Sequence, residues 1–321
     1  MDSITQGVLG AAVGAAILGK KTGQRGAATG AVIATVPDLD IVLYLFYDKY
    51  EMLSIHRGLS HSIIFSILGG FLVAIILSKL KWFHGIKFRT LILYSWLCLF
   101  THIILDAFTA YGTQLFLLFS NSRVGFDSIN VVDPVYTAPL IIGLFFSVCD
   151  FTSYTSKFRF NNYGLILSSI YLIFTLINKQ NVKTEISKIL SEENIEYSDL
   201  LTIPVGIANL NWYGVAKGKD SIYMMKYYIF SSENSSIDRF AINENYLNQI
   251  DKKIADKMRW FAKGFYTVDN VNEKIRLFNL QVDMRGIVTY QNKKAPTRGY
   301  FEFSVENGKT TFSSGSLKSD K

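Results

Sequence analysis

The sequence predicts a mainly α-helical membrane protein that ends in a small α+β domain outside the membrane. Apolar segments recur through residues 1–178, only 18% of the chain is charged, and residues 179–321 contain no further apolar span. A soluble protein would have about 25% charged residues, so part of this chain is expected in a membrane. We therefore predict two domains, a membrane helix bundle over 1–178 and a soluble domain over 179–321.

Six apolar segments are predicted to form transmembrane or re-entrant helices. The first, residues 7–19, is short and rich in Gly and Ala. Its small residues four apart, such as Gly10 and Gly14, would let another helix pack closely in lipid. The other segments approach the roughly 20 residues that cross a hydrocarbon core. They are residues 27–47, 60–80, 89–108, 134–150 and 163–178.

The loop charges predict the orientation of this bundle. Lysine and arginine are concentrated in the first, third and fifth links, around residues 20–25, 79–89 and 157–159. The second and fourth links hold few basic residues. By the positive-inside rule the odd links are cytoplasmic, and both ends of the chain, including the α+β domain, face outward.

Three short polar signatures interrupt the apolar segments. They are Pro37-Asp38-Leu39-Asp40, His56-Arg57-Gly58-Leu59-Ser60-His61 and His102-Ile103-Ile104-Leu105-Asp106. An ionisable group deep in a membrane costs about 2.5 kcal/mol or more on insertion scales, so it marks a functional site. Histidines and carboxylates are ligands of zinc and related divalent metals. Because all three signatures fall on the predicted outer side, we expect one metal site there.

His102 and Asp106 are four residues apart, so they project from one face of a helix. This spacing suits two ligands of one metal, or one ligand and a carboxylate that orients it. A buried His–Asp pair that holds two helices together would have the same spacing. The other signatures on the same side favour the metal site.

The pair His56 and His61 cannot share one face of a regular helix at a spacing of five. Gly58 predicts a turn and Ser60 a helix N-cap, so His61 would begin a helix while His56 lies in the loop. Both histidines are predicted metal ligands. Arg57 is suited to an anionic group such as phosphate, or to a nearby carboxylate.

The two aspartates after Pro37 would point to nearly opposite faces of an ideal helix. Pro37 removes a backbone donor, so a local distortion is expected. One aspartate is predicted to bind metal and the other to orient a ligand or activate water, and the sequence leaves the choice open. Asp38 and Asp40 are both catalytic candidates, and Asp40 is also a candidate ligand.

Four further polar residues are predicted to line a substrate pocket near these signatures. They are Gln6, Arg57, Tyr111 and Asp133. Asp133 precedes Pro134, so capping of the fifth helix is an alternative role for it.

The C-terminal region has the pattern of an α+β domain. Residues 200–216, 222–231, 275–284 and 298–305 are rich in β-branched and aromatic residues, which favours strands. Residues 237–262 have helical periodicity. Because the region contains no histidine, we expect the chemistry to lie in the membrane bundle.

The opening Met1-Asp2-Ser3-Ile4-Thr5-Gln6, the three signatures and the stretch Thr109-Ala110-Tyr111-Gly112-Thr113-Gln114 resemble the YdjM-like bacterial membrane-bound metal-dependent hydrolases. The resemblance covers roughly residues 1–178. It implies a multi-pass protein of the bacterial inner membrane and a hydrolase that uses a divalent metal, for which zinc is expected. The HxxxD spacing is also similar to that of zinc-dependent phospholipases C. Many members have a histidine where this chain has Gln6, which leaves fewer imidazoles here.

These observations predict a hydrolase that cleaves a lipid or lipid-linked (phospho)ester with metal-activated water. An ion- or proton-coupled transporter and a membrane-anchored binding module are the alternatives. Nucleic acid is not an expected partner, because the net charge of +7 is concentrated beside apolar segments and forms no basic stripe with aromatics. Cys98 and Cys149 lie in apolar segments and are expected as buried thiols.

Overall fold

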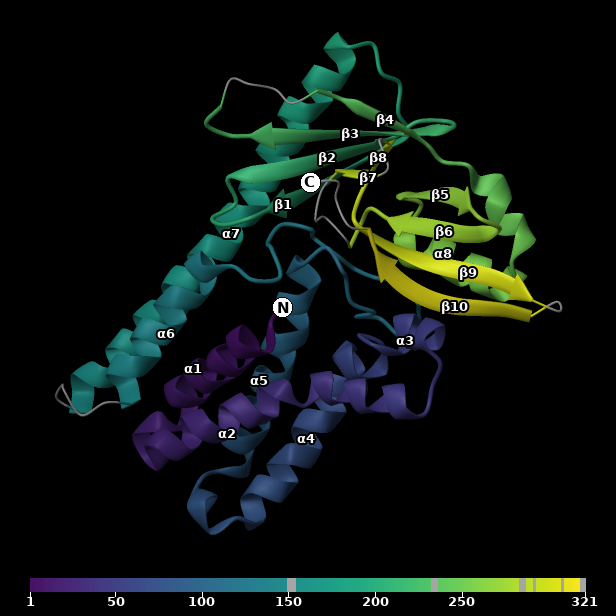
Figure 1. The fold of residues 1–321 in the computed structure, drawn as a ribbon. Coiled ribbons are helices and arrows are strands. Elements are labelled where there is room, and N and C mark those ends of the chain that lie inside the picture. The colour runs from purple at the N-terminus through teal and green to yellow at the C-terminus, as the bar shows by residue number, and fades with distance from the viewer. Residues whose placement is uncertain (149–153, 232–235, 283–286, 291–292, 307–308, 318–321) are drawn as a thin grey trace. The chain divides into compact units, whose positions relative to one another are not determined.

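The computed structural model describes residues 1–148, 154–231, 236–282, 287–290, 293–306 and 309–317. The chain forms two compact units. The first comprises Met1–Leu45 and Ile55–Ile177, and the second Phe46–Ser54 and Asn178–Lys321. The first unit is helical, whereas the named strands of the described residues lie in the second (Figure 1).

The helices α1 (Ser3–Thr22) and α2 (Gln24–Thr35) form a tight hairpin at the start of the first unit (Figure 1). Asp2 caps α1 by accepting a hydrogen bond from the backbone N–H of Thr5, so the helix begins before the apolar run. A Cβ atom placed on Gly14 would lie 2.2 Å from the carbonyl oxygen of Gly26. The close packing predicted from the small residues of α1 is therefore confirmed.

The second predicted segment is broken at its proline. The helix α2 ends at Thr35, and a 3-10 helix, η1 (Pro37–Leu45), continues at an angle of 46°. Pro37 has no N–H to donate to the preceding turn, which explains the break.

The third predicted segment also begins irregularly. The short helices α3 (Lys49–Ile55) and η2 (Leu59–His61) precede α4 (Ile63–Lys79). The residue that caps α4 is Ser62, which accepts from the N–H of Phe65. The expectation that Ser60 is this cap was wrong, because the turn continues two residues further than Gly58 suggested.

The helix α5 (Phe88–Phe108) follows the turn η3 (Lys81–Phe83) and supplies much of the core of the first unit. Tyr94, Cys98 and Leu99 are fully buried in that core. Cys98 is thus the buried free thiol that the sequence predicted. Cys149 lies outside the described residues.

The last helices of the first unit are α6 (Pro134–Val148) and the start of α7 (Tyr154–Glu192). A glycine also allows these two helices to pack closely, because a Cβ atom on Gly143 would lie 2.6 Å from the carbonyl oxygen of Phe160. Three helices, α1, α5 and α7, are long and apolar enough to cross a membrane, or up to five if each bent pair counts as one span. A membrane protein is therefore supported, with α6 shorter than a span.

In its described residues, the second unit is an α+β domain with two four-stranded antiparallel sheets and a two-stranded one. The first sheet has the order β1 (Asp199–Val205), β2 (Asn211–Lys217), β3 (Ser221–Tyr228), β4 (Asp238–Ala241). The second has the order β10 (Lys309–Ser316), β9 (Gly299–Glu306), β6 (Lys274–Asn279), β5 (Tyr266–Val271). The third pairs β7 (Val288–Tyr290) with β8 (Lys293–Ala295). The C-terminal part of α7 buries Ile186 against Trp212 of the first sheet.

The α+β class of this region was predicted, but several of its elements differ. Residues 200–216 form a hairpin of two strands. Residues 237–262 contain β4 and a 3-10 helix, η4 (Glu244–Gln249), so the α-helix α8 is limited to Lys252–Ala262. The two units divide between Ile177 and Asn178, next to the predicted boundary at 178, and this point falls inside α7 because the helix continues after its apolar run ends.

Candidate metal centre

Four side chains from the three polar signatures converge in the first unit. Asp38 comes from η1, His61 from η2, and His102 and Asp106 from the last turns of α5. One ligand atom from each lies within 4.8 Å of the ligand atoms of the other three. His61, His102 and Asp106 are buried and Asp38 is partly exposed, so the group has one open side.

The distances within this group fit one divalent metal. Nε2 of His61 lies 3.3 Å from Nε2 of His102, from Oδ1 of Asp38 and from Oδ2 of Asp106. Nε2 of His102 lies 3.6 Å from the same two carboxylate oxygens. A tetrahedral zinc ion with ligands at about 2.0–2.1 Å would hold its ligand atoms roughly 3.3 Å apart. Oδ2 of Asp106 is buried and accepts no hydrogen bond from the described residues, as expected of an atom that faces a cation.

The orientation of His61 is fixed through its other ring nitrogen. The Ser60 hydroxyl donates to Oδ2 of Asp40 at 2.9 Å and lies 2.9 Å from Nδ1 of His61. Because its single proton is used on Asp40, Ser60 can only accept from Nδ1–H of His61. A neutral His61 with its proton on Nδ1 would present an unprotonated Nε2 to the ligand group, which is the arrangement found around metal-bound histidines.

The other carboxylate oxygen of Asp106, Oδ1, is held by several donors. Gln6 Nε2 donates to Oδ1 at 3.1 Å, and Nη2 of Arg57 lies 3.3 Å from the same atom. The amino group of Met1 also contacts Oδ1. These contacts leave Oδ2 as the oxygen that faces the two histidines.

Two predicted ligands, Asp40 and His56, lie outside the four-residue group. Oδ1 of Asp40 pairs with Nδ1 of His56 at 2.8 Å, and its Oδ2 accepts from the backbone N–H of Arg57 at 3.2 Å. The sequence left open which of the two aspartates would join the histidines, and in the structure it is Asp38. A 3-10 helix turns about 120° per residue, so residues two apart point in different directions.

The predicted substrate residues have different surroundings. Gln6 is fully buried and contacts Asp106. Asp133 caps α6 by accepting from Val135 N–H at 2.9 Å and also accepts from the Tyr171 hydroxyl at 2.8 Å, as the alternative interpretation expected. The ring of Tyr111 lies 5.7 Å from that of His56. Of the four, Gln6 and Arg57 contact Asp106 of the ligand group, and Tyr111 lies beside His56 and Arg57.

Sequence reasoning missed two residues near this group. Ser60 was interpreted as a helix cap, although its position beside His61 was a signal that it could contact the ring. Arg123 lies in the fourth link, where the sequence predicted few basic residues and no role for this one, and its guanidinium carbon lies 4.7 Å from the centre of the Tyr111 ring. No local pattern connects Arg123 with Tyr111, twelve residues earlier.

Comparisons with known proteins assign the part of the chain that holds this group to a family. Residues 1–182, which contain every member of the ligand group, match the family described as YdjM inner membrane protein. The chain belongs to the YdjM family. This YdjM-family protein is also 35% identical over 141 residues to the uncharacterized protein YfhP of Bacillus subtilis (strain 168). That match covers 42% of this chain and 42% of YfhP, so it spans less than half of the relative. No solved structure gives a significant match.

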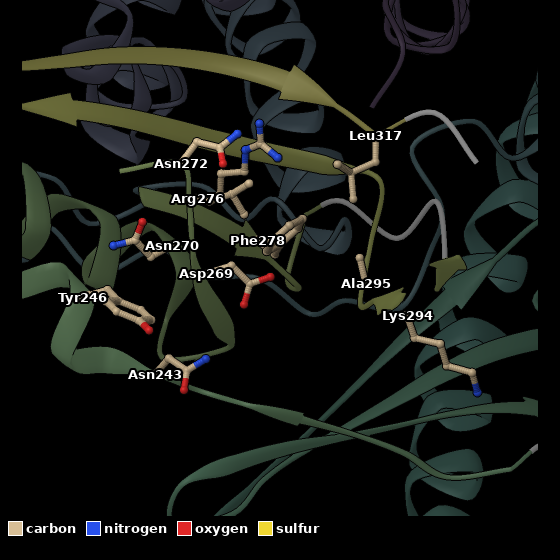
Figure 2. A pocket seen from close by; sticks show the side chains of 11 residues that line it. Asn243, Tyr246, Asp269, Asn270, Asn272, Arg276, Phe278, Lys294, Ala295 and Leu317 are labelled. Atoms are coloured by element: carbon tan, nitrogen blue, oxygen red, sulfur yellow. The ribbon is translucent and has the colours of Figure 1, made fainter. Parts of the chain in front are cut away.

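The second unit of the YdjM-family protein contains a separate cavity of about 550 Å³ (Figure 2). It is lined by Asn243, Tyr246, Asp269, Asn270, Val271, Asn272, Arg276, Phe278, Lys294, Ala295 and Leu317. Arg276 pairs with Glu302 and Lys294 with Asp238, so both basic groups in its wall are engaged. The lining has neither histidine nor cysteine, and the candidate metal ligands are those of the first unit.

Proposed function

We propose that this YdjM-family protein is a metal-dependent hydrolase that cleaves an ester or phosphoester of a lipid or lipid-linked substrate at the outer face of the membrane. The observation that carries the proposal is the convergence of two imidazoles and two carboxylates. The Nε2 atoms lie 3.3 Å from each other and 3.3–3.6 Å from the carboxylate oxygens, and all four ligand atoms lie within 4.8 Å of one another. Asp38, His61, His102 and Asp106 would hold the metal, and zinc is the ion proposed. When bound, such an ion supplies a Lewis acid that activates water at neutral pH.

The surrounding residues have positioning roles in this proposal. Ser60 and Asp40 keep the proton of His61 on Nδ1, which leaves Nε2 free to bind. Because Asp40 already accepts from Ser60 and from the N–H of Arg57 and pairs with His56, we assign it to positioning and not to activating water.

His56 is the proposed proton donor of the reaction. Hydrolysis joins a water oxygen to the substrate and releases an alcohol, so a proton must reach the departing oxygen. The side chain of His56 is 25% exposed, and its Nδ1 is held 2.8 Å from Oδ1 of Asp40. This pairing leaves Nε2 of His56 as the ring atom that can deliver the proton.

A lipid substrate is supported by the surface of η1. Leu39 and Ile41 are 61% and 58% exposed and alternate along η1 with Asp38 and Asp40. An apolar chain could therefore lie beside the ligand group without leaving the membrane. The loop charges support the outer face as the side from which substrate enters.

The transporter alternative requires ionisable groups along the depth of the bundle. In the described part of the first unit, the buried acidic, basic and histidine side chains belong to the polar signatures and to the segment between α5 and α6. They are Asp40, Arg57, His61, His102, Asp106, Arg123, Asp127 and Asp133. This clustering supports a single site over a relay.

Elemental analysis of detergent-purified protein tests the proposal. The wild type is expected to retain about one divalent metal per chain, whereas His61→Ala and His102→Ala lose it. His84→Ala is the matched control, because His84 is the exposed histidine outside the signatures. A folded wild type without metal after incubation with zinc would overturn the proposal. Metal-loaded protein that cleaves neither soluble nor lipid (phospho)esters would overturn the hydrolase activity, and a binding module in the second unit would then be favoured.

A further inference from the structure

Two buried arginines share one aromatic ring beside the candidate metal centre. The guanidinium carbons of Arg57 and Arg123 each lie 4.7 Å from the centre of the Tyr111 ring. Arg57 is 7% exposed and Arg123 is 5% exposed. Arginine is almost never this buried unless a partner offsets its charge. Asp106 contacts Arg57 and the charge of Asp127 acts on Arg123, yet the two buried cations share one ring.

Arg57 connects this pair to the ligand group. Its Nη2 lies 3.3 Å from Oδ1 of Asp106, and its Nη1 donates to the Thr109 hydroxyl at 3.0 Å. Its Nε is buried and has no hydrogen-bond partner among the described residues. A guanidinium presents planar donors that match the oxygens of a phosphate, so Arg57 retains a donor for such a group.

The charges favour an anion once the metal is bound. A divalent ion would offset Asp38 and Asp106, so Arg57 would lose the carboxylate that neutralises it. Burial lowers the pKa of Arg123 to about 10, and the charge of Arg57 acts in the same direction. Arg123 nevertheless remains charged at neutral pH. An additional anion near both guanidiniums would relieve this unfavourable environment.

A purely structural stack is the simplest alternative. One cation–π contact is expected in about every 70–80 residues, so a single arginine on Tyr111 would need no special reason. That frequency does not account for a second buried arginine at the same ring. It also does not account for the contact of Arg57 with Asp106 of the ligand group.

We propose that Arg57, Arg123 and Tyr111 form an anion subsite that holds the phosphate group of the substrate next to the metal centre. This inference rests on the proposed hydrolase function and narrows its substrates to phosphate esters. The shared chemistry is a phosphate group, which a lipid headgroup or a soluble phosphate can supply.

Phosphate binding to the full-length, zinc-loaded protein tests the subsite directly. Inorganic phosphate is titrated calorimetrically, and a second titration uses detergent micelles with phosphatidic acid, with diacylglycerol micelles as the blank. Arg123→Gln is expected to weaken phosphate binding at least ten-fold and to keep its metal. Arg89→Gln, which changes an exposed arginine at the start of α5, is expected to bind as the wild type does. Equal binding by Arg123→Gln and wild type, or no binding to wild type, overturns the subsite.

A second variant separates charge from folding. Arg123→Lys keeps the positive charge and is expected to bind phosphate more tightly than Arg123→Gln, with thermal unfolding recorded for both. Equal affinities of the two folded variants would overturn the role of the Arg123 charge. If only Arg123→Lys folds, tighter binding by wild type than by this variant supports the guanidinium fork, and equal binding contradicts it.

The two proposals fail in distinguishable ways. Protein without metal whose phosphate binding still depends on Arg123 would overturn the hydrolase and keep the subsite. Metal-loaded protein without phosphate binding would keep the hydrolase and overturn the subsite. Within a supported subsite, stronger binding of phosphatidic acid than of inorganic phosphate assigns the phosphate to a lipid headgroup, and equal binding assigns it to a soluble ester.

Discussion

The Nε2 atoms of His61 and His102 lie 3.3 Å apart, although 41 residues separate the two histidines in the chain. Metal binding requires both Nε2 atoms to be unprotonated, and at this distance their lone pairs would then repel each other. Two carboxylate oxygens within 3.6 Å add negative charge. A cation among these four atoms would convert this repulsion into attraction, so we expect the stability of the folded chain to depend on metal.

Metal removal should therefore lower the thermal unfolding midpoint of the purified protein. At a free metal concentration 100-fold above its dissociation constant, binding would stabilise the native state by about 2.7 kcal/mol. The midpoint is measured with zinc and after treatment with a chelator. His61→Ala should unfold at the same temperature in both conditions. If zinc raised the midpoint of this variant as much as that of the wild type, a site at His61 would be contradicted.

The hydroxyl of Ser60 should matter for metal affinity. Ser60→Ala removes the group that accepts from Nδ1 of His61, so the ring loses its fixed tautomer. We expect affinity for zinc to fall about 10–100-fold, measured by competition with a chromogenic chelator. Ser78→Ala is the control, because Ser78 is an exposed residue near the other end of α4. Unchanged affinity in Ser60→Ala would argue against the hydrogen-bond relay.

The two aspartates of η1 should respond differently to the same change. Asp38→Asn replaces a proposed ligand and should abolish stoichiometric metal binding, because its Oδ1 lies 3.3 Å from Nε2 of His61. Asp40→Asn changes a residue that contacts Ser60 and His56, so metal should bind with reduced affinity. Metal content and affinity of both variants are compared. If Asp40→Asn lost its metal and Asp38→Asn bound metal with reduced affinity, Asp40 would be the ligand and Asp38 the positioning residue.

The packing of α1 on α2 should be intolerant of added volume. A Cβ atom on Gly14 would lie 2.2 Å from the backbone of Gly26, so Gly14→Ala must separate the helices. A destabilisation of about 1–3 kcal/mol is expected in detergent. Gly7→Ala is the control, since no atom lies within 4 Å of a Cβ atom at that position. Equal thermal midpoints of the two variants would show that the hairpin can adjust.

The proposed outer location of the site is tested by labelling cysteines in intact cells. Cys98 and Cys149 are first replaced by alanine. Ser122→Cys, in the exposed part of the segment between α5 and α6, should react with a membrane-impermeant maleimide added outside. Lys81→Cys, in a predicted cytoplasmic link, should react only after permeabilisation. The opposite pattern would place the ligand group on the cytoplasmic side.

Local sequence patterns predicted two local features that the structure shows. His102 and Asp106 lie on one face of α5 because a helical period is a property of neighbouring residues. Pro37 distorts the second segment because it lacks an N–H. The membrane character of the first unit followed from its composition. The assignment of metal ligands remains a prediction.

The sequence alone determined that the chain belongs in a membrane, that polar signatures interrupt its helices, and that an α+β unit follows. Only the tertiary structure decided that Asp38 faces the two histidines while Asp40 turns to His56 and Ser60. It also brought Arg123 to the ring of Tyr111. Secondary structure follows from interactions between residues near in sequence. Contacts between distant segments depend on how whole helices and turns pack, and no local pattern encodes that packing.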